Sequence, residues 1–165
     1  FLNLMFNLKA EFYLKIIFLF SFIALISAFF IEYILGHQPC NLCLIERIPY
    51  GLSIMIIMAI FLIRKNQKFL VMLLILTFIF SFAISFYHFG IEQGFFQESS
   101  VCGVKSSAEI VTKEDLLKQL SEKTISCKDV TFRIFGLSLT SINIVISLLF
   151  IITLLKIFKK YEKNK

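Results

Sequence analysis

Four long apolar runs alternate with polar segments along this chain of 165 residues. They cover roughly residues 12–35, 44–63, 69–89 and 135–157. A helix needs ~20 apolar residues to cross a bilayer, and each run is long enough. The pattern therefore predicts an all-α integral membrane protein, folded over residues 1–165 as one domain with a bundle of four transmembrane helices.

The composition supports this class, because 58% of the residues are apolar and 21 are phenylalanine. A removable secretory signal peptide is excluded for the first run, which is too long and is followed by three more. Residues 1–11 are interpreted as a short cytoplasmic lead. Since the chain begins with Phe1 instead of methionine, we expect a few residues to precede it.

One long polar segment, residues 91–134, separates the third run from the fourth. Thr112 followed by acidic residues is typical of a helix start, and three leucines then share one helix face. We predict a short amphipathic helix over about 113–123, on the membrane surface or against the bundle. A mobile loop that happens to contain leucines is the alternative.

Charged residues are divided unequally between the two sides of the predicted bundle. The two chain ends and the 64–68 loop together hold ten Lys/Arg and two acids. Residues 36–47 and 91–134 together hold seven Lys/Arg and eight acids. Because cytoplasmic loops are rich in Lys and Arg, we expect both termini in the cytoplasm and all four cysteines on the outer side. The net charge of +6 follows this distribution, and no nucleic-acid binding is expected.

The chemistry concentrates where the first apolar run ends and the second begins. Cys40 and Cys43 form a Cys-x-x-Cys pair there, and Arg47 follows the second cysteine by four residues. Counting back from Ile63, the end of the second run, places Cys43 in the first turn or cap of a helix. The helix dipole and Arg47 both favour a thiolate, so we expect Cys43 to be the more activated sulfur.

Three other interpretations of this pair fit the residues less well. A zinc site needs four ligands, and the two cysteines, His37 and one distant group do not form a recognisable set, so no metal is expected. A c-type haem site needs His directly after the second cysteine, where Leu44 stands. A structural disulfide spanning two residues constrains the unfolded chain very little. We therefore interpret the pair as redox-active.

Three further residues of the apolar runs lead to expectations about the structure. Glu32 lies within a turn of the end of the first run and is expected to be a solvated carboxylate at headgroup level rather than a functional acid. Pro49 is expected to bend or loosen the second helix. His88, at the end of the third run, is most often an interfacial residue, but it lies at the depth of Cys43 and can hydrogen-bond a small redox molecule.

Cys102 and Cys127 are separated by 24 residues within the long polar segment. A structural bridge that closes this loop, worth roughly 3 kcal/mol, is the interpretation that the spacing alone favours. The other interpretation is an exchangeable pair, because two disulfides in one compartment with mobile backbone between them can exchange. The presence of the Cys40 and Cys43 pair in the same compartment shifts the balance toward the exchangeable interpretation.

The stretches PCNLCLIERIPYG, YHFGIEQGFF and CKDVTFRIFGLSLTSIN, with two outer cysteine pairs over four runs, resemble the disulfide bond formation protein B (DsbB) family over nearly the whole chain. The resemblance implies a bacterial inner-membrane oxidoreductase. It would reoxidise a periplasmic thioredoxin-fold partner similar to DsbA and pass the electrons to a quinone, either ubiquinone or menaquinone.

Site residues follow from the same resemblance by position. Cys102 and Cys127 match the pair that exchanges with the partner, while Cys40 and Cys43 match the pair that hands electrons to quinone. Within the Cys-x-x-Cys pair, Cys43 would be the thiolate against the quinone ring. Arg47 and His88 would contact the quinone. The segment between the two loop cysteines does not align with the family, which leaves the partner-binding surface open.

Two further functions stay open on the residues. One is a membrane thiol oxidoreductase that runs in the reducing direction. The other is a non-enzymatic four-helix scaffold whose disulfides are structural.

Overall fold

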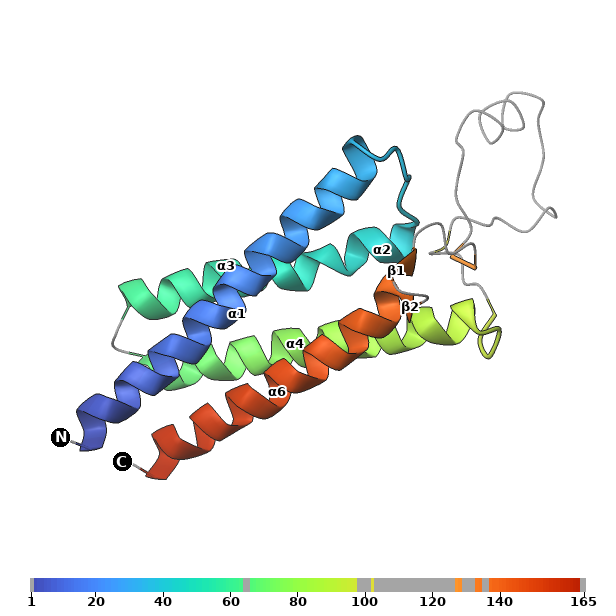
Figure 1. The fold of residues 1–165 in the computed structure, drawn as a ribbon. Helices are drawn as coiled ribbons and strands as arrows, with labels where there is room; N and C mark the ends of the chain where they lie inside the picture. Colours follow the sequence, from blue (N-terminus) through green and yellow to red (C-terminus); the bar gives the residue numbers. More distant parts are fainter. Residues whose placement is uncertain are drawn as a thin grey trace, which may run out of the picture.

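The computed structural model describes residues 2–63, 66–97, 102, 127–128, 133–134 and 137–163. Its long helices lie lengthwise beside one another in a bundle (Figure 1). The helices are α1 (Leu2–Tyr33), α2 (Asn41–Ile45), α3 (Arg47–Leu62), α4 (Gln67–Glu92) and α6 (Leu139–Lys163). Taking α2 and α3 together, four helical segments are long and apolar enough to cross a membrane. The predicted class, an all-α membrane protein with four spans, is confirmed.

The first and third helices are longer than predicted. α1 begins at Leu2, so the first residues are not a separate lead; they are mostly apolar and contain no Gly or Pro. α4 continues to Glu92 and is followed by Gly94, whose φ of 78° favours glycine and ends the helix.

The fourth span begins later than the predicted residue 135. Strand β1 (Arg133–Ile134) pairs antiparallel with β2 (Leu137–Ser138), so the chain forms a small hairpin before the helix. The hydroxyl of Ser138 accepts a hydrogen bond from the backbone N–H of Ser141 at 3.2 Å, which caps α6. The predicted helix at 113–123 lies outside the described residues.

The second span is broken between α2 and α3. Glu46 stands at the junction, after α2 and before α3. Pro49 occupies the first turn of α3 and has no N–H to donate to the carbonyl of Ile45 one turn earlier. The predicted loosening by proline therefore takes the form of a break, and the two cysteines of this span lie on a short helix of their own.

Aromatic and small polar side chains fill the middle of the bundle. Phe78 on α4 is fully buried and makes edge-to-face contacts with Tyr50 on α3 and Phe150 on α6. Two serine pairs, Ser21 with Ser53 and Ser81 with Ser147, form hydrogen bonds between helices at 2.9 and 3.1 Å. Small residues let helices approach closely inside a membrane, so these pairs fix how α1 meets α3 and how α4 meets α6.

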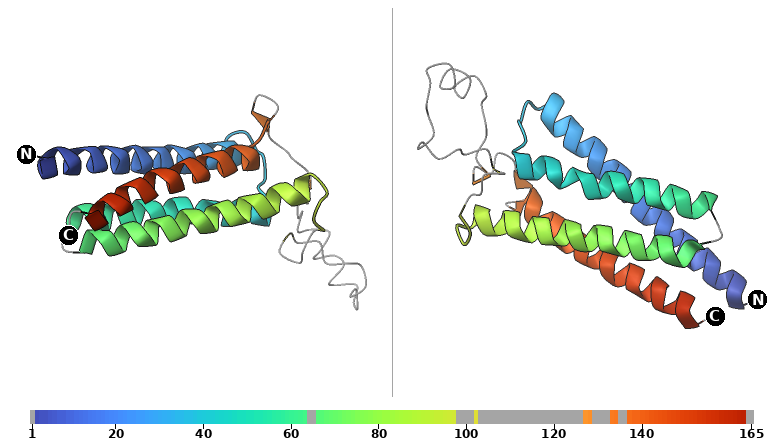
Figure 2. Two further views of the ribbon diagram at one scale, coloured as in Figure 1. Left: turned by 90° about the horizontal axis from the view of Figure 1, so that it is seen from below. Right: turned by 180° about the vertical axis from the view of Figure 1, so that it is seen from behind.

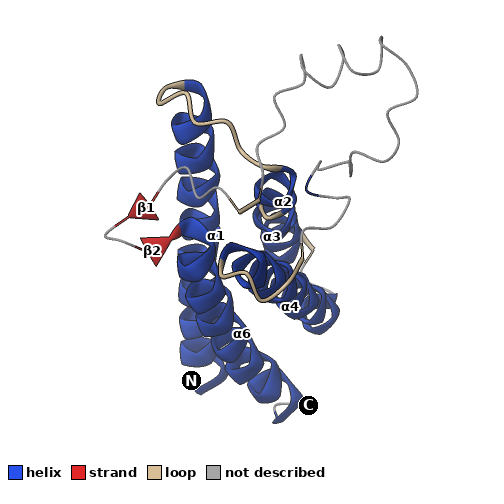
Figure 3. Ribbon diagram, turned by 90° about the vertical axis from the view of Figure 1, so that its right-hand side faces the viewer, coloured by secondary structure: helices blue, strands red, loops and turns tan. Residues whose placement is uncertain are grey.

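The two ends of the bundle differ in what they carry. Both termini lie at one end, as does the connection from α3 to α4, and α2 lies at the opposite end (Figures 1 and 2). Figure 3 looks at this opposite end and shows α2 and the β1–β2 hairpin there. We call it the cysteine end, because Cys40 and Cys43 belong to α2 and its cap. Among the residues that the structure describes, most Lys and Arg belong to the end with the termini.

A candidate redox site at the cysteine end

The helix α2 positions the first cysteine pair. Cys40 is its N-cap residue, in an extended conformation with φ −71° and ψ 166°. The Sγ atom of Cys40 accepts a hydrogen bond from the backbone N–H of Cys43 at 3.3 Å, as a capping oxygen would. One helical turn brings the two sulfurs to 2.8 Å, and both residues are free thiols in this structure.

Cys40 is the sulfur that these surroundings stabilise as a thiolate. Its pKa is lowered to about 4, first by the hydrogen bond from the Cys43 thiol, and further by the hydrogen bond and charge of His88 and by the Cys43 N–H, although burial opposes the shift. The prediction that Cys43 is the more activated sulfur is therefore wrong for this dithiol form. The reason is that the helix begins at Asn41, so Cys40 is the cap where the donors converge.

The second cysteine pair lies against the first. Cys102 and Cys127 are buried together with Cys40, Leu42 and Ile91 in one cluster. The sulfurs of Cys40 and Cys127 and a ring nitrogen of His88 all lie within 4.8 Å of one another. Burial raises the pKa of the Cys127 thiol, as do its hydrogen bond with Cys102 and the negative charge of Cys40. Three predicted site residues from distant parts of the sequence thus meet at one point.

His88 is buried and is not the interfacial residue that its position suggests. Only 2% of His88 is exposed, and its Nε2 atom lies 3.6 Å from the sulfur of Cys40. On the other side of the ring, Nδ1 lies 3.0 Å from a carboxylate oxygen of Glu46 and 3.3 Å from the hydroxyl of Thr140. The ring therefore stands between a cysteine and a carboxylate.

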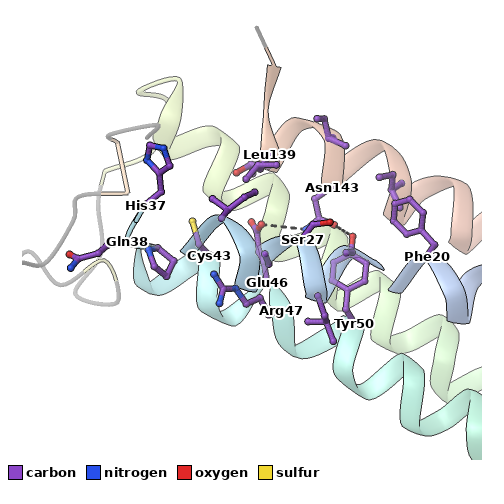
Figure 4. Close-up of a pocket in the computed structure, with 18 residues that line it drawn as sticks. Phe20, Ser27, His37, Gln38, Cys43, Glu46, Arg47, Tyr50, Leu139 and Asn143 are labelled. Atoms are coloured by element: carbon purple, nitrogen blue, oxygen red, sulfur yellow. Dashed lines mark hydrogen bonds between the residues drawn. The ribbon is translucent and has the colours of Figure 1, made fainter. Parts of the chain in front are cut away.

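A cavity of about 250 Å³ opens beside this cluster, between α1, the α2–α3 segment and α6. Most of its wall is apolar side chain from α1 and α6 (Figure 4). Six side chains from the α2–α3 segment and α6 bring polar or sulfur atoms to the wall: Cys43, Glu46, Arg47, Tyr50, Thr140 and Asn143. The second sulfur of the Cys-x-x-Cys pair thus faces the cavity, while His88 is not among the lining residues.

Arg47 is held in the cavity wall by residues of α1. Its guanidinium donates a hydrogen bond to the carboxylate of Glu32 and lies 5.3 Å from the ring centre of Phe29. Glu32 is 22% exposed, so it is a partly buried partner of Arg47 and not the solvated carboxylate that we expected. The ion pair orients the arginine and joins α1 to α3 at the cavity.

A chain of hydrogen bonds along the cavity wall includes residues that sequence reasoning missed. Tyr50 donates to Oδ1 of Asn143, and Nδ2 of Asn143 donates to Oε2 of Glu46 at 3.3 Å (Figure 4). Nδ2 of Asn143 also donates to the hydroxyl of Ser85 at 2.7 Å. Thr140 donates a hydrogen bond to Oε1 of Glu92, on α4, at 2.9 Å. An acid or amide inside an apolar run is costly unless it has a partner or a function, which is the signal that marks Glu46 and Asn143.

Comparison with known proteins agrees with the site. Residues 10–157 match the family described as disulfide bond formation protein DsbB. A similar protein is the uncharacterized protein RP370 of Rickettsia prowazekii (strain Madrid E), which is 32% identical over 147 residues, covering 88% of this chain and 86% of the relative. No solved structure matches the chain. The family match covers most of the chain, including both cysteine pairs, and this membrane protein therefore belongs to the DsbB family of disulfide bond formation oxidoreductases.

Proposed function

We propose that this protein takes two electrons from a reduced thioredoxin-fold dithiol similar to DsbA and passes them through its two cysteine pairs to a quinone. The observation that carries the proposal is the position of Cys40. Its sulfur lies within 4.8 Å of the sulfur of Cys127 and 2.8 Å from that of Cys43, which lines the cavity. Cys40 therefore links the loop pair to the cavity wall.

The first exchange is between the partner and the loop pair. A thiolate of the reduced partner attacks the Cys102–Cys127 disulfide, and a mixed disulfide forms. The second thiol of the partner then releases the partner as a disulfide and leaves Cys102 and Cys127 as thiols. Two electrons and two protons have then entered the protein.

The second exchange is between the two pairs. The Cys127 thiolate attacks Cys40 of the Cys40–Cys43 disulfide, a Cys40–Cys127 bond forms, and Cys43 leaves as a thiolate beside the cavity. Cys102 then attacks Cys127, so the loop disulfide forms again and Cys40 and Cys43 are both reduced. The buried cluster supports this step, because a short movement of two sulfurs replaces a long movement of the chain.

The lowered pKa of Cys40 and the raised pKa of Cys127 support one direction of electron flow between the two pairs. A thiol with a lowered pKa stabilises the reduced form of its pair, so the corresponding disulfide is more oxidising. The pKa of Cys40 is lowered to about 4, whereas that of Cys127 is raised. Electrons are therefore expected to pass from the loop pair to the Cys-x-x-Cys pair. This direction disfavours the alternative of an enzyme that reduces its protein partner.

The cavity fits a quinone ring as the acceptor. Its wall is mostly apolar, as a flat ring requires, and it offers Arg47, Asn143 and Tyr50 as hydrogen-bonding groups near the sulfur of Cys43. A bound quinone would supply the two-electron acceptor, and Arg47 would favour negative charge on its oxygens.

We place the cysteine end on the periplasmic side of a bacterial inner membrane, with both termini in the cytoplasm. Among the described residues, the end of the bundle with the termini carries most of the Lys and Arg, and such residues favour the cytoplasmic side. A periplasmic partner then reaches Cys102 and Cys127 from water, and a lipid-soluble acceptor reaches the cavity from the membrane.

The test of the proposed function uses the purified full chain in detergent. Addition of a reduced thioredoxin-fold dithiol and a soluble ubiquinone or menaquinone analogue is expected to give one reduced quinone for each dithiol oxidised. The same quinone must stay oxidised when the protein is left out. A protein that exchanges disulfides with the partner but reduces neither analogue would contradict the quinone assignment.

Arg47 gives a prediction that separates binding from exchange. Because a hydrogen bond to a charged group contributes about 1.5–3 kcal/mol, Arg47→Ala is expected to raise the KM for quinone by about tenfold or more. Glu32→Gln removes the partner that orients Arg47 and is expected to raise the KM by a smaller factor. Exchange with the protein partner, measured without quinone, serves as the control and should change little. An unaltered KM in Arg47→Ala would exclude Arg47 from the quinone site.

A further inference from the structure

The carboxylate of Glu46 connects the buried cysteine cluster to the cavity. One of its oxygens lies 3.0 Å from Nδ1 of His88, and the other accepts a hydrogen bond from Asn143 at 3.3 Å. Its side chain is 11% exposed and also lines the cavity (Figure 4). The proposed exchange of electrons does not by itself require this acid.

The reaction at the cavity needs protons as well as electrons. Oxidation of the Cys40–Cys43 dithiol breaks two S–H bonds, forms one S–S bond and releases two protons. Reduction of a quinone to a quinol takes up two electrons and two protons. The cavity wall is largely apolar, so protons need a path built from side chains.

The proton of each thiol has a different surrounding through which it can leave. Cys43 lines the cavity, and its thiol proton has a direct route to an acceptor bound there. Cys40 is 6% exposed and belongs to the buried cluster instead. The nearest base to its sulfur among the described contacts is Nε2 of His88, at 3.6 Å.

The ring of His88 is oriented for transfer from one side to the other. A proton on Nδ1 is shared with Glu46, and this leaves Nε2 to take the proton of the Cys40 thiol. When Nε2 has gained that proton, Nδ1 can release its own proton to the carboxylate of Glu46. The lowered pKa of Cys40 agrees with a proton that already resides on the ring in the reduced protein.

We propose that His88 and Glu46 form a proton relay that carries the proton of Cys40 to the quinone in the cavity. The relay rests on the proposed function. For each turnover, the Cys40 proton moves to Nε2, a proton moves from Nδ1 to Glu46, and Glu46 gives a proton to one quinone oxygen. Cys43 gives the second proton, two electrons leave the sulfurs, and the Cys40–Cys43 disulfide forms. Glu46 is therefore a catalytic residue.

Several other groups face the ring of His88. Besides Cys40 and Glu46, His88 faces Cys127 and Glu92, whose oxygen lies 3.9 Å from Nε2. Thr140 from α6 faces the same ring nitrogen as Glu46.

Among the described residues, the side chain of Glu46 forms hydrogen bonds with a histidine and an amide. It faces His88 and Asn143, while the nearby Arg47 is paired with Glu32. Since Asn143 holds the carboxylate with a neutral amide, Glu46 can gain and lose a proton without breaking an ion pair with arginine.

The test compares Glu46→Gln with the unmodified protein, using a soluble quinone analogue and a reduced thioredoxin-fold dithiol. Glutamine keeps the shape and a hydrogen-bond acceptor but cannot carry a proton. General acid–base catalysis contributes about 10²–10⁴-fold, so kcat for quinone reduction is expected to fall by about 100-fold, with a KM within about twofold. Glu46→Asp, which keeps the acid, is expected to recover part of the loss.

Two measurements separate a relay from a structural role. The first is the solvent deuterium isotope effect on kcat, expected to be about 2 or more in the unmodified protein; a value of 1 would overturn the relay even if Glu46→Gln fails to fold. The second is a matched variant, Glu92→Gln, which also removes a carboxylate beside His88 but lies outside the set of cavity-lining residues. Its kcat is expected to fall by less than tenfold. An equal loss in both variants would assign the effect to charge near His88 and overturn the relay.

Failure of the relay and failure of the proposed function give different results. If the unmodified protein reduces quinone and Glu46→Gln keeps its kcat and isotope effect, only the relay is overturned. If the unmodified protein reduces no quinone, the proposed function fails and the relay fails with it. Disulfide exchange between the partner and the Cys102–Cys127 pair, measured without quinone, shows whether the Glu46→Gln protein is folded.

Discussion

Replacing Cys43 with serine is expected to lower quinone reduction to the rate measured without the protein. Cys43 is the sulfur of the Cys-x-x-Cys pair that lines the cavity, and its removal prevents the Cys40–Cys43 disulfide from forming. Serine keeps the size and polarity, so the helix α2 and its cap remain. The measurement is the loss of quinone absorbance under turnover with a reduced thioredoxin-fold dithiol. Unchanged turnover in this variant would contradict the electron path.

Cys102→Ser is the matched control for that experiment. It removes the loop disulfide and therefore the exchange with the protein partner, but it leaves Cys40, Cys43 and the cavity intact. With a small dithiol such as dithiothreitol as the donor, Cys102→Ser is expected to keep reducing quinone, and Cys43→Ser is not. Loss of dithiothreitol-driven quinone reduction in Cys102→Ser as well would contradict the prediction that this small dithiol reduces the Cys40–Cys43 pair without the loop pair.

The second large effect concerns the ionisation of Cys40. Its pKa of about 4 lies far below the value of about 9 for an ordinary thiol, so the reduced protein is expected to hold a thiolate throughout the range from pH 5 to 8. The thiolate should be lost only as the pH falls through about 4. His88→Ala removes a hydrogen bond and a charge that favour the thiolate, so protonation should occur at higher pH.

Absorbance of the thiolate at 240 nm, followed during acid titration of the reduced protein, measures this pKa. The potential of the Cys40–Cys43 pair gives an independent check, because each unit of rise in the pKa of Cys40 makes the disulfide less oxidising by about 30 mV. Asn143→Ala, which alters the cavity wall without touching Cys40, is the control. An identical titration in His88→Ala and the unmodified protein would remove His88 from the stabilisation of the thiolate.

Much of the architecture follows from hydropathy and cysteine spacing. Four apolar runs predict four spans, and the position of Cys40 and Cys43 before the second run predicts their place at a helix start. The residue at which this helix starts could not be predicted, because hydropathy alone does not show that Asn41 is helical or that Cys40 caps the helix. That shift of a few residues decides which of the two sulfurs receives the hydrogen bonds.

The polar contacts of the site depend on which helix faces meet, and local sequence does not encode this. His88 at the end of an apolar run gives the same pattern whether it faces lipid headgroups or a buried thiol. Glu46 and Asn143 are 97 residues apart, and only the packed bundle brings them together. Glu32 is a similar case, because its partner Arg47 belongs to the next span. For both Glu32 and Glu46, the signal available in the sequence is an acidic residue within or at the edge of an apolar run.

The central claim is that Cys40 joins the loop pair to the Cys-x-x-Cys pair. The most direct measurement uses the double variant Cys43→Ser/Cys102→Ser, in which Cys40 and Cys127 are the remaining thiols. After mild oxidation, peptide mapping by mass spectrometry is expected to find a Cys40–Cys127 disulfide in most molecules. The comparison variant Cys40→Ser/Cys102→Ser, which leaves Cys43 and Cys127, should form far less. Two free thiols in the first variant, or equal bridging in both, would contradict the account.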